Sequence, residues 1–353
     1  MTTVVAAEAF PEPWVSASPT RLSLWEFVRT SGLQSLVLGT SKDPNAKITI
    51  LLISPETGLP VVAVKAPTTD EAARAVEAER RVLGDLWRLQ PRGVVETIPR
   101  VVDILDFEGR PAVVTTAVQG ASMTTAYLGR RHTAHSARVA ADFDAVGRWL
   151  ADFQARTTGP PAPIDMDGGV LLRLRKRFPD DERLTADLAR LAEIHGRLQK
   201  NTLARTAVHG DFWFGNVLLV DGDVAGVVDW EAGTTSGEPV RDLVRFALMY
   251  ALYLDCRTRA GRRVAGHAGL HAGAWGAGVE YALNGTGWFP DLFRHFIGEG
   301  LARVGASPAS WRDAALAGLA EVAALTDDPE FARRHLELFR RVAHARGGEA
   351  EAA

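Results

Sequence analysis

Apolar clusters rich in β-branched residues recur through the first third of the chain. They occupy residues 36–38, 48–53, 61–64 and 112–118, and turn-forming residues separate several of them. Between the third and fourth clusters, a helix is predicted over Asp70–Leu89, where apolar residues recur at helical spacing, at Ala72, Val76, Leu83, Leu86 and Leu89. Strands, one helix and strands again predict a small α+β lobe over residues 21–118.

The pattern changes after Gln119-Gly120, where amphipathic helical segments take over. These segments are residues 142–157, 183–200, 240–254, 310–325 and 329–344. One stretch, 217–228, has the pattern of a β-hairpin. The glycine-rich stretch 261–287 fits either a loop or a closely packed helix. We therefore expect a larger, mainly helical lobe over 119–353, and a flexible proline-containing segment over 1–20.

Composition narrows the class of protein. The 353 residues are 46% hydrophobic and 24% charged, with a net charge of -3, which is typical of a globular protein with room for two domains. There is no basic excess to indicate a nucleic-acid partner. The longest apolar run, 246–254, is too short to span a membrane, and no secretory signal is visible. The single cysteine, Cys256, fits a reducing compartment. We expect a cytoplasmic protein.

The strongest chemical signal is His209-Gly210-Asp211, followed by Asn216. Its H-x-D-x-x-x-x-N spacing is that of a kinase catalytic loop. Phosphoryl transfer needs a carboxylate at the attacking hydroxyl and oxygen ligands for Mg²⁺ nearby, and a short loop can supply both. Taken alone, a His-x-Asp sequence is more often a capped turn.

The residues after this loop bring a second carboxylate to the same place. Asp221-Gly222-Asp223 is a good hairpin turn. Pairing Val220 with Val224 sets Asn216 opposite Val228, so that Asp229 emerges beside Asn216 at the open end of the hairpin. An amide and a carboxylate placed together predict a Mg²⁺ site formed by Asn216 and Asp229.

Upstream, Val62-Ala63-Val64-Lys65 ends a predicted strand in the manner of the V-A-I-K strand of kinases. Only five of the 40 basic residues are lysines, so a lysine at this position is less easily dismissed as a surface residue. Its expected partner is Glu79 on the following helix, because that residue shares a face with the buried leucines at i+4 and i+7. Glu77 lies on a different face and is the poorer choice.

Other residues near the motif have structural explanations as well. Asp242 near the start of a helix is either a helix-start acid or a clamp on the catalytic loop. The aromatic residues 212–214 are most simply core packing around the loop. For Trp230, packing is favoured over a place in the ligand pocket.

Together these residues resemble the aminoglycoside phosphotransferase and choline kinase group. The resemblance is dense over residues 205–245, where the motif is followed by Asp229-Trp230-Glu231, Gly237-Glu238-Pro239 and Asp242. It extends more loosely to Lys65, Glu79 and a predicted hinge at 115–120, whereas 255–353 matches no pattern that we can name.

The resemblance implies a protein-kinase-like two-lobed fold with ATP, or GTP, and Mg²⁺ between the lobes. Asp211 would be the catalytic carboxylate, and His209 would brace the catalytic loop. Asn216 and Asp229 would bind Mg²⁺. The nucleotide would contact a set of N-lobe and hinge residues, namely Lys65, Glu79, Thr116 and Val118. Glu231 would assist near the metal or the substrate.

Two departures from protein kinases bear on the acceptor. The first hairpin has Gly39-Thr40-Ser41-Lys42-Asp43 in place of a G-x-G-x-x-G loop. Only twelve residues separate Asp229 from Asp242, and no A-P-E follows, which is too short for a peptide-positioning segment. We therefore expect a small hydroxylated acceptor such as a sugar, an amino alcohol or an aminoglycoside.

The arginine run Arg257, Arg259, Arg262 and Arg263 favours a neutral or anionic acceptor over an aminoglycoside. Two other readings compete with an active kinase. One is a catalytically idle kinase fold that binds nucleotide or a partner protein. The other is a metal-dependent hydrolase that uses His209, Asp211 and Asp229. The pattern specifies no oligomeric state.

Overall fold

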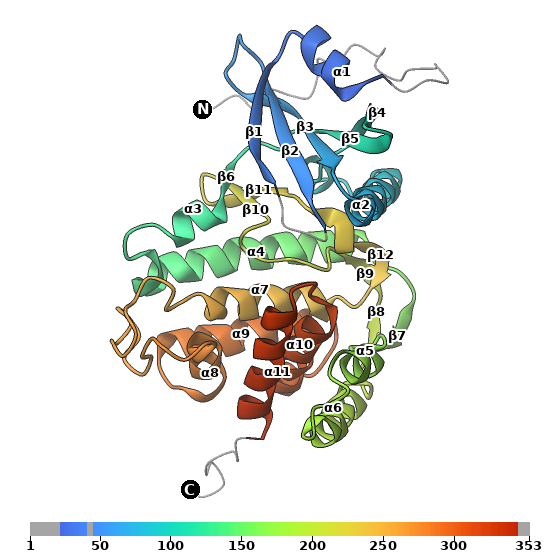
Figure 1. Ribbon diagram of the computed structural model, residues 1–353. Coiled ribbons are helices and arrows are strands. Elements are labelled where there is room, and N and C mark those ends of the chain that lie inside the picture. The colour runs from blue at the N-terminus through green and yellow to red at the C-terminus, as the bar shows by residue number, and fades with distance from the viewer. Residues whose placement is uncertain (1–21, 41–44, 345–353) are drawn as a thin grey trace, which may run out of the picture.

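The computed structural model describes residues 22–40 and 45–344, which form a smaller lobe built on a β-sheet and a larger lobe built on helices (Figure 1). This division confirms the predicted α+β architecture. The predicted flexible segment 1–20 and most of the predicted turn at 39–43 lie outside the described residues. The limits predicted for the two segments, 21–118 and 119–353, stay predictions.

The smaller lobe contains, in the described chain, a five-stranded antiparallel sheet with the order β1-β2-β3-β5-β4. Its strands are β1 (Gln34–Thr40), β2 (Lys47–Ile53), β3 (Pro60–Pro67), β4 (Val101–Phe107) and β5 (Arg110–Thr116). Ile50 pairs with Val64, and both face a core that α1 (Leu24–Thr30) covers. Because side chains alternate along a strand, Lys65 lies on the opposite face.

That opposite face is covered by α2, whose limits, Asp70–Leu89, are those predicted for the helix. The helix begins at Thr69, whose hydroxyl accepts a hydrogen bond from the Ala72 backbone N–H at 3.1 Å, a standard N-cap. Leu83 and Leu86 are fully buried and belong to the same hydrophobic cluster as the helices of the larger lobe. Helix α2 therefore links the two lobes.

Helices make up most of the larger lobe. They are α3 (Met123–Tyr127), α4 (Ser136–Arg156), α5 (Val170–Arg177), α6 (Leu184–Leu198), α7 (Val240–Leu252), α8 (Ala277–Asn284), α9 (Trp288–Arg303), α10 (Trp311–Leu325) and α11 (Pro329–Ala343). Single 3₁₀ turns occur as η1 (Val95–Thr97), η2 (His132–Ala134), η3 (Trp230–Ala232) and η4 (Pro308–Ser310). All five predicted helices are confirmed. The glycine-rich stretch 261–287 contains both structures that its sequence allowed, a loop up to Gly276 and the helix α8 after it.

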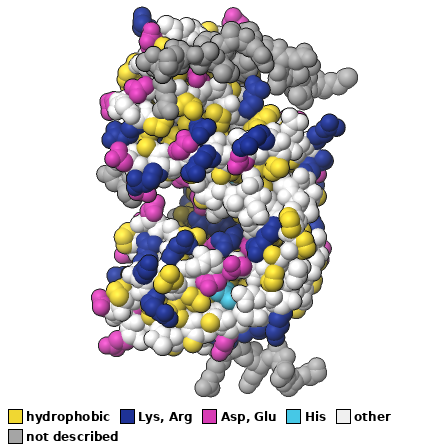
Figure 2. Space-filling model, turned by 90° about the vertical axis from the view of Figure 1, so that its right-hand side faces the viewer, with side chains coloured by type: hydrophobic (Ala, Val, Ile, Leu, Met, Phe, Trp, Pro, Cys, Tyr) yellow, Lys and Arg dark blue, Asp and Glu magenta, His cyan; other side chains and the backbone are white. Residues whose placement is uncertain are grey.

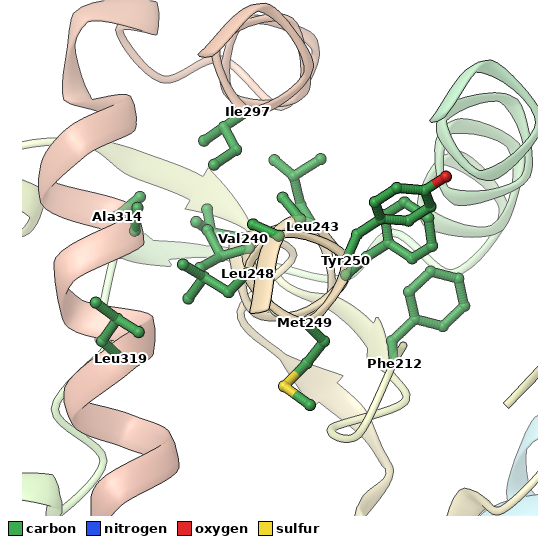
Figure 3. Close-up of a cluster of buried hydrophobic side chains, with 14 of the residues drawn as sticks. Phe212, Val240, Leu243, Leu248, Met249, Tyr250, Ile297, Ala314 and Leu319 are labelled. Carbon is green, nitrogen blue, oxygen red and sulfur yellow. The ribbon is translucent and has the colours of Figure 1, made fainter. Parts of the chain in front are cut away.

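Helix α7 is the centre of this lobe, and most of its side chains are buried on every side. Figure 3 shows it end-on, with Ile297 of α9 and Ala314 and Leu319 of α10 around it, and Phe212 of the catalytic loop near Tyr250. A helix that is apolar all round belongs in a core rather than on a surface. Its first turn is thereby held rigidly beneath the catalytic loop.

Short strands complete the larger lobe, and three of them, β9, β10 and β11, flank the motif residues. They are β6 (Ala121–Ser122), β7 (Pro161–Pro163), β8 (Thr202–Ala204), β9 (Thr206–Val208), β10 (Val217–Val220), β11 (Asp223–Val227) and β12 (Thr234–Gly237). Strands β10 and β11 form the predicted hairpin, but the predicted register at its tip is wrong. Val220 pairs with Asp223, not with Val224, because Asp221 and Gly222 both adopt positive φ and form a two-residue turn.

An irregularity between Leu218 and Leu219 restores the predicted register farther along the hairpin. Val217 pairs with Val227, and the Val228 N–H donates to the Asn216 carbonyl at 3.0 Å. The prediction that Asn216 lies opposite Val228 is therefore confirmed. Within the residues that the structure describes, none of the helices has both the length and the apolar character that crossing a bilayer demands.

Candidate active site

His209 follows β9 and is completely buried. Its Nε2 lies 2.8 Å from the Val228 carbonyl oxygen, and the Asp211 N–H donates to its Nδ1 at 3.2 Å. A carbonyl can only accept, so Nε2 carries the ring hydrogen and Nδ1 is the acceptor. With both nitrogens occupied, His209 ties the catalytic loop to the hairpin, and its ring is not directed at a substrate.

Asp242 holds the same loop from the first turn of α7. It is buried, and its two carboxylate oxygens accept from the backbone N–H groups of His209 (2.7 Å) and Gly210 (2.9 Å). Burial raises the pKa of Asp242, while the nearby His209 and these hydrogen bonds act in the opposite direction. Of the two readings that the sequence allowed, the clamp is the one observed. Gly210 has a φ of 82°, and a Cβ there would collide with the Ala232 carbonyl oxygen, so the turn requires glycine.

Asn216 and Asp229 come together at the open end of the hairpin. The Asn216 side-chain N–H₂ donates to the Asp211 carbonyl oxygen at 2.9 Å, which leaves the amide oxygen available as a ligand. Asp229 adopts a φ of 66°, in the left-handed region that non-glycine residues seldom occupy outside special sites. An amide oxygen beside an ionised carboxylate is a donor set that suits Mg²⁺.

Lys65 crosses from the sheet to meet Asp229. Its ammonium donates to both oxygens of Glu79, at 2.6 and 2.7 Å, and to Asp229 Oδ1. Burial disfavours the charged amine, but the two carboxylates outweigh it and raise the pKa of Lys65. In turn, the Lys65 charge lowers the pKa of Asp229 to about 2, against the opposing effect of desolvation on this partly exposed carboxylate. Glu79 also accepts from the Trp230 N–H at 3.2 Å, so the acid predicted on the helix joins α2 to the segment that follows Asp229.

A second lysine reaches the same region. Lys47, at the start of β2, forms an ion pair with Glu231, which also accepts from Asn45 Nδ2 at 3.1 Å. The larger effect of Lys65 and the smaller effect of the Lys47 charge both lower the pKa of Asp229, whereas desolvation raises it. Glu231 therefore contacts the smaller lobe. Sequence reasoning missed Lys47, although the scarcity of lysine applied to it as much as to Lys65.

The carboxylate of Asp211 is bound by an arginine that the sequence analysis did not identify. Arg245 of α7 donates to Asp211 Oδ1 from Nη2 at 2.5 Å and from Nε at 3.1 Å. Arg245 follows Asp242 by three residues, so both lie on one face of α7. That spacing was the available signal, because a helix face that clamps the loop also carries its i+3 neighbour toward the loop.

The predicted hinge residues lie where the chain leaves the sheet. The Thr116 hydroxyl accepts a hydrogen bond from the Arg100 backbone N–H at 2.9 Å, so it is engaged at the sheet edge. The Val118 side chain packs against Gly226, where a Cβ would collide with it. Among the described residues, the backbone N–H and carbonyl of Val118 pair with no other protein group.

The aromatic residues of the motif confirm the packing interpretation. Phe212, Phe214 and Trp230 are buried, and the Trp230 indole N–H donates to the Val227 carbonyl at 2.8 Å. Trp213 is only partly buried and lies against Tyr253, with ring centroids 6.2 Å apart. The loop is therefore anchored by its side chains on the core side, which leaves Asp211 and Asn216 on the cleft side.

Comparisons with solved structures support the fold. Over 92% of this chain and 99% of the other, the structure matches the apo form of a thermostable mutant of aminoglycoside phosphotransferase APH(4)-Ia, with a TM-score of 0.55 and 14% identity. A further mutant form of that enzyme, in ternary complex with ADP and hygromycin B, gives a TM-score of 0.55 at 12% identity, over 92% of this chain and 98% of that one.

The sequence comparisons identify the family. A search of curated proteins gives no match. The profile of the phosphotransferase enzyme family (APH), however, matches residues 49–277. That span covers more than half of the chain and contains Lys65, Glu79, the catalytic loop, Asp229 and Asp242. The two-lobed architecture is thus that of the kinase-like phosphotransferases, and the chain belongs to the phosphotransferase enzyme family.

Proposed function

We propose that this protein transfers the γ-phosphate of ATP to a hydroxyl group of a small molecule. The observation that carries the proposal is the set of ionic contacts that joins the lobes. Lys65 of the sheet, Glu79 of α2 and Asp229 of the hairpin end form one cluster, and Asp229 adjoins the loop that presents Asp211 and Asn216. Phosphoryl transfer depends mainly on positioning and on electrostatic stabilisation, and these groups supply both.

Lys65 would hold the phosphates of the nucleotide. Its ammonium stays charged at neutral pH because two carboxylates raise its pKa, so it remains a fixed positive charge for an incoming anion. Asn216 and Asp229 would hold Mg²⁺, which when bound neutralises charge on the β- and γ-phosphates. The unpaired backbone groups of Val118 suit the edge of a purine base; the same groups could accept GTP, which stays an alternative donor.

Asp211 acts on the acceptor. The acceptor hydroxyl oxygen forms a bond to the γ-phosphorus while the bond from that phosphorus to the β–γ bridging oxygen breaks. The bridging oxygen departs on ADP with the electron pair, and the hydroxyl proton passes to the Asp211 carboxylate. His209 and Asp242 keep Asp211 in place through the backbone of the loop, and they exchange no proton with the acceptor.

A small acceptor is supported by the short connection between Asp229 and Asp242. This segment is occupied by η3 and β12, and β12 pairs with β9 beside the catalytic loop. It leaves no extended loop on which a peptide could be positioned. The similar aminoglycoside phosphotransferase APH(4)-Ia binds a small molecule, hygromycin B, together with ADP, which agrees with this class of acceptor.

The test is a phosphorylation screen with γ-labelled ATP and Mg²⁺ against sugars, sugar acids, amino alcohols and aminoglycosides. We expect label to move to at least one acceptor and the phosphorylated product to show the mass of one added phosphoryl group. Asp211→Asn serves as the inactive control. ATP-dependent thermal stabilisation without transfer to any acceptor would favour a catalytically idle kinase fold and would contradict the proposal.

A further inference from the structure

The ion pair between Arg245 and Asp211 engages one oxygen of the carboxylate that would receive the acceptor proton. Both Nε and Nη2 of the guanidinium donate to Oδ1. The other oxygen, Oδ2, lies 3.5 Å from the side-chain nitrogen of Asn216, a proposed metal ligand. An acceptor hydroxyl bound at Oδ1 would share that oxygen with Arg245.

Two other titratable groups lie within the influence of the Arg245 charge. Glu321 of α10 already forms an ion pair with Arg241, one turn earlier on α7. Burial lowers the pKa of His335 of α11 to about 4, so it is neutral at physiological pH. Once Asp211 takes up the hydroxyl proton, it is neutral and no longer balances the positive charge of Arg245.

The space between the lobes contains charged side chains. On the face that carries α2, Figure 2 shows a hollow between the lobes with Lys and Arg side chains in it and Asp and Glu side chains beside it. Arg245 is itself only partly exposed, at 21% of its side-chain surface. A partly buried guanidinium binds a planar oxyanion through two nitrogens with little loss of side-chain freedom. Arg245 already shows this binding mode toward the Asp211 carboxylate.

Tyr253, at the end of α7, extends the site away from Asp211. Its ring contacts Trp213 and Phe214 of the catalytic loop, with centroids 6.2 and 5.8 Å apart. It also lines a pocket of 410 Å³, together with Trp275 and Phe331. This space is enough for a metabolite-sized molecule, and Tyr253 separates it from the catalytic loop, because neither Arg245 nor Asp211 lines it.

We infer that the acceptor carries an anionic group, a carboxylate or a phosphate, which Arg245 binds when the acceptor hydroxyl takes its place at Asp211. The inference rests on the proposed kinase function and narrows its acceptor to hydroxy acids, sugar acids or sugar phosphates. It places specificity on α7. The exposed arginines after α7, which suggested the same preference in the sequence, are not needed for it.

The experiment compares acceptors that share a carbon skeleton and differ in charge, such as gluconate with sorbitol and glycerate with glycerol, with aminoglycosides included. We expect kcat/KM for the anionic member of a pair to exceed that for the neutral member by about 10- to 100-fold, the range of a charge-assisted hydrogen bond. Arg245→Gln should abolish this preference, and Arg245→Lys should retain part of it. Arg257→Gln, which removes an exposed positive charge, is the matched control and should keep it.

Three results would contradict the inference. An equal loss for anionic and neutral acceptors in Arg245→Gln would show that Arg245 only positions Asp211. Efficient transfer to neutral alcohols or aminoglycosides, with no preference for anions, would refute the anionic acceptor and leave the kinase function intact. No transfer to any acceptor, with the ATP merely hydrolysed or untouched, would contradict the function and the inference together.

Discussion

On the nucleotide side of the cleft Lys65 is enclosed by two carboxylates, whereas on the acceptor side Asp211 is bound by a single arginine. The first cluster joins three elements from both lobes, and Glu79 contributes to it twice, through Lys65 and through the Trp230 N–H. The second is one contact between the loop and α7. Several contacts thus hold the charged groups of the proposed nucleotide side in place, whereas the carboxylate of the proposed acceptor side depends on one side chain.

This difference fits what each side would bind under the proposed function. A triphosphate and Mg²⁺ would be common to kinases with different acceptors, so residues in fixed motifs can form their site. The acceptor would differ between enzymes, and the residues proposed to bind it lie outside the motifs. Arg245 and Tyr253 come from a helix whose sequence mainly records its burial in the core.

The largest expected effect is on the acceptor side. Asp211→Asn removes the proton acceptor and should lower kcat by about 10³- to 10⁴-fold, within the range of general base catalysis. Lys65, Asn216 and Asp229 are untouched, so the affinity for ATP, measured by calorimetry, should stay close to that of the wild type. A parallel loss of ATP affinity would show that the two sides are not separable at Asp211.

Next in size is the loss of the nucleotide-side lysine. Lys65→Met should lower kcat/KM for ATP by about 10³-fold, as removal of a transition-state charge contact does. The order of preference among acceptors should not change, because Arg245 and Asp211 are intact. Lys176→Met on the exposed face of α5 is the control and should have normal kinetics. Full activity in Lys65→Met would mean that the phosphates bind elsewhere.

The clamp between the two sides should affect stability more than chemistry. Asp242→Asn leaves one of the backbone N–H groups of His209 and Gly210 facing an amide N–H₂, and should lower the free energy of unfolding by about 2 kcal/mol. Urea denaturation measures this change. Asp291→Asn, at the exposed start of α9, tests the effect of a helix-start acid alone, which is worth about 0.3–1 kcal/mol. Equal losses of unfolding free energy in the two variants would show that Asp242 acts only as a helix-start acid and does not clamp the loop.

The smallest effect is a pH dependence on the nucleotide side. The pKa of Asp229 is lowered to about 2 by Lys65, so its contribution to stability is complete above its ordinary pKa, near 3.9, and is lost as the pH falls toward 2. The difference in unfolding free energy between wild type and Asp229→Asn should be constant from about pH 5 to 7 and shrink below about pH 4. The Asp229 side chain is 42% exposed, so added salt should reduce the difference as well. If this difference in unfolding free energy grew on acidification, the pKa of Asp229 would be raised in the folded protein and not lowered.

The sequence predicted the parts of the site that local pairing creates. Asn216 and Asp229 meet because one hairpin brings them together, and a slip of register at the tip, corrected by the irregularity at Leu218 and Leu219, did not disturb this. Asp211 and Lys65 were assigned from motifs, and their chemical roles stay predictions. Lys47 and Arg245 depend on packing between distant segments, so the sequence offered only indirect signals for them, the scarcity of lysine and the i+3 spacing from Asp242.

The missed fold elements have similar causes. Strand β4 pairs at the sheet edge with a register shift between Val101 and Asp103, and its two aspartates interrupt the apolar alternation. Helix α9 contains Pro290, Gly298 and Gly300, which lower helix propensity, yet it forms because Phe289, Phe293 and its other apolar residues are buried in the core. In both, tertiary contacts override the local signal.

The contact between Lys65 and Asp229 has a consequence for how the nucleotide enters. Before binding, this lysine is already neutralised by an anion of the protein itself, so a triphosphate does not arrive at a bare charge. In the proposed reaction it would exchange places with the Asp229 carboxylate, which would then be free to hold a metal ion. The affinity for the nucleotide would thus depend on how much more strongly the triphosphate binds the Lys65 ammonium than Asp229 does. An enzyme arranged in this way can bind ATP firmly and still release ADP.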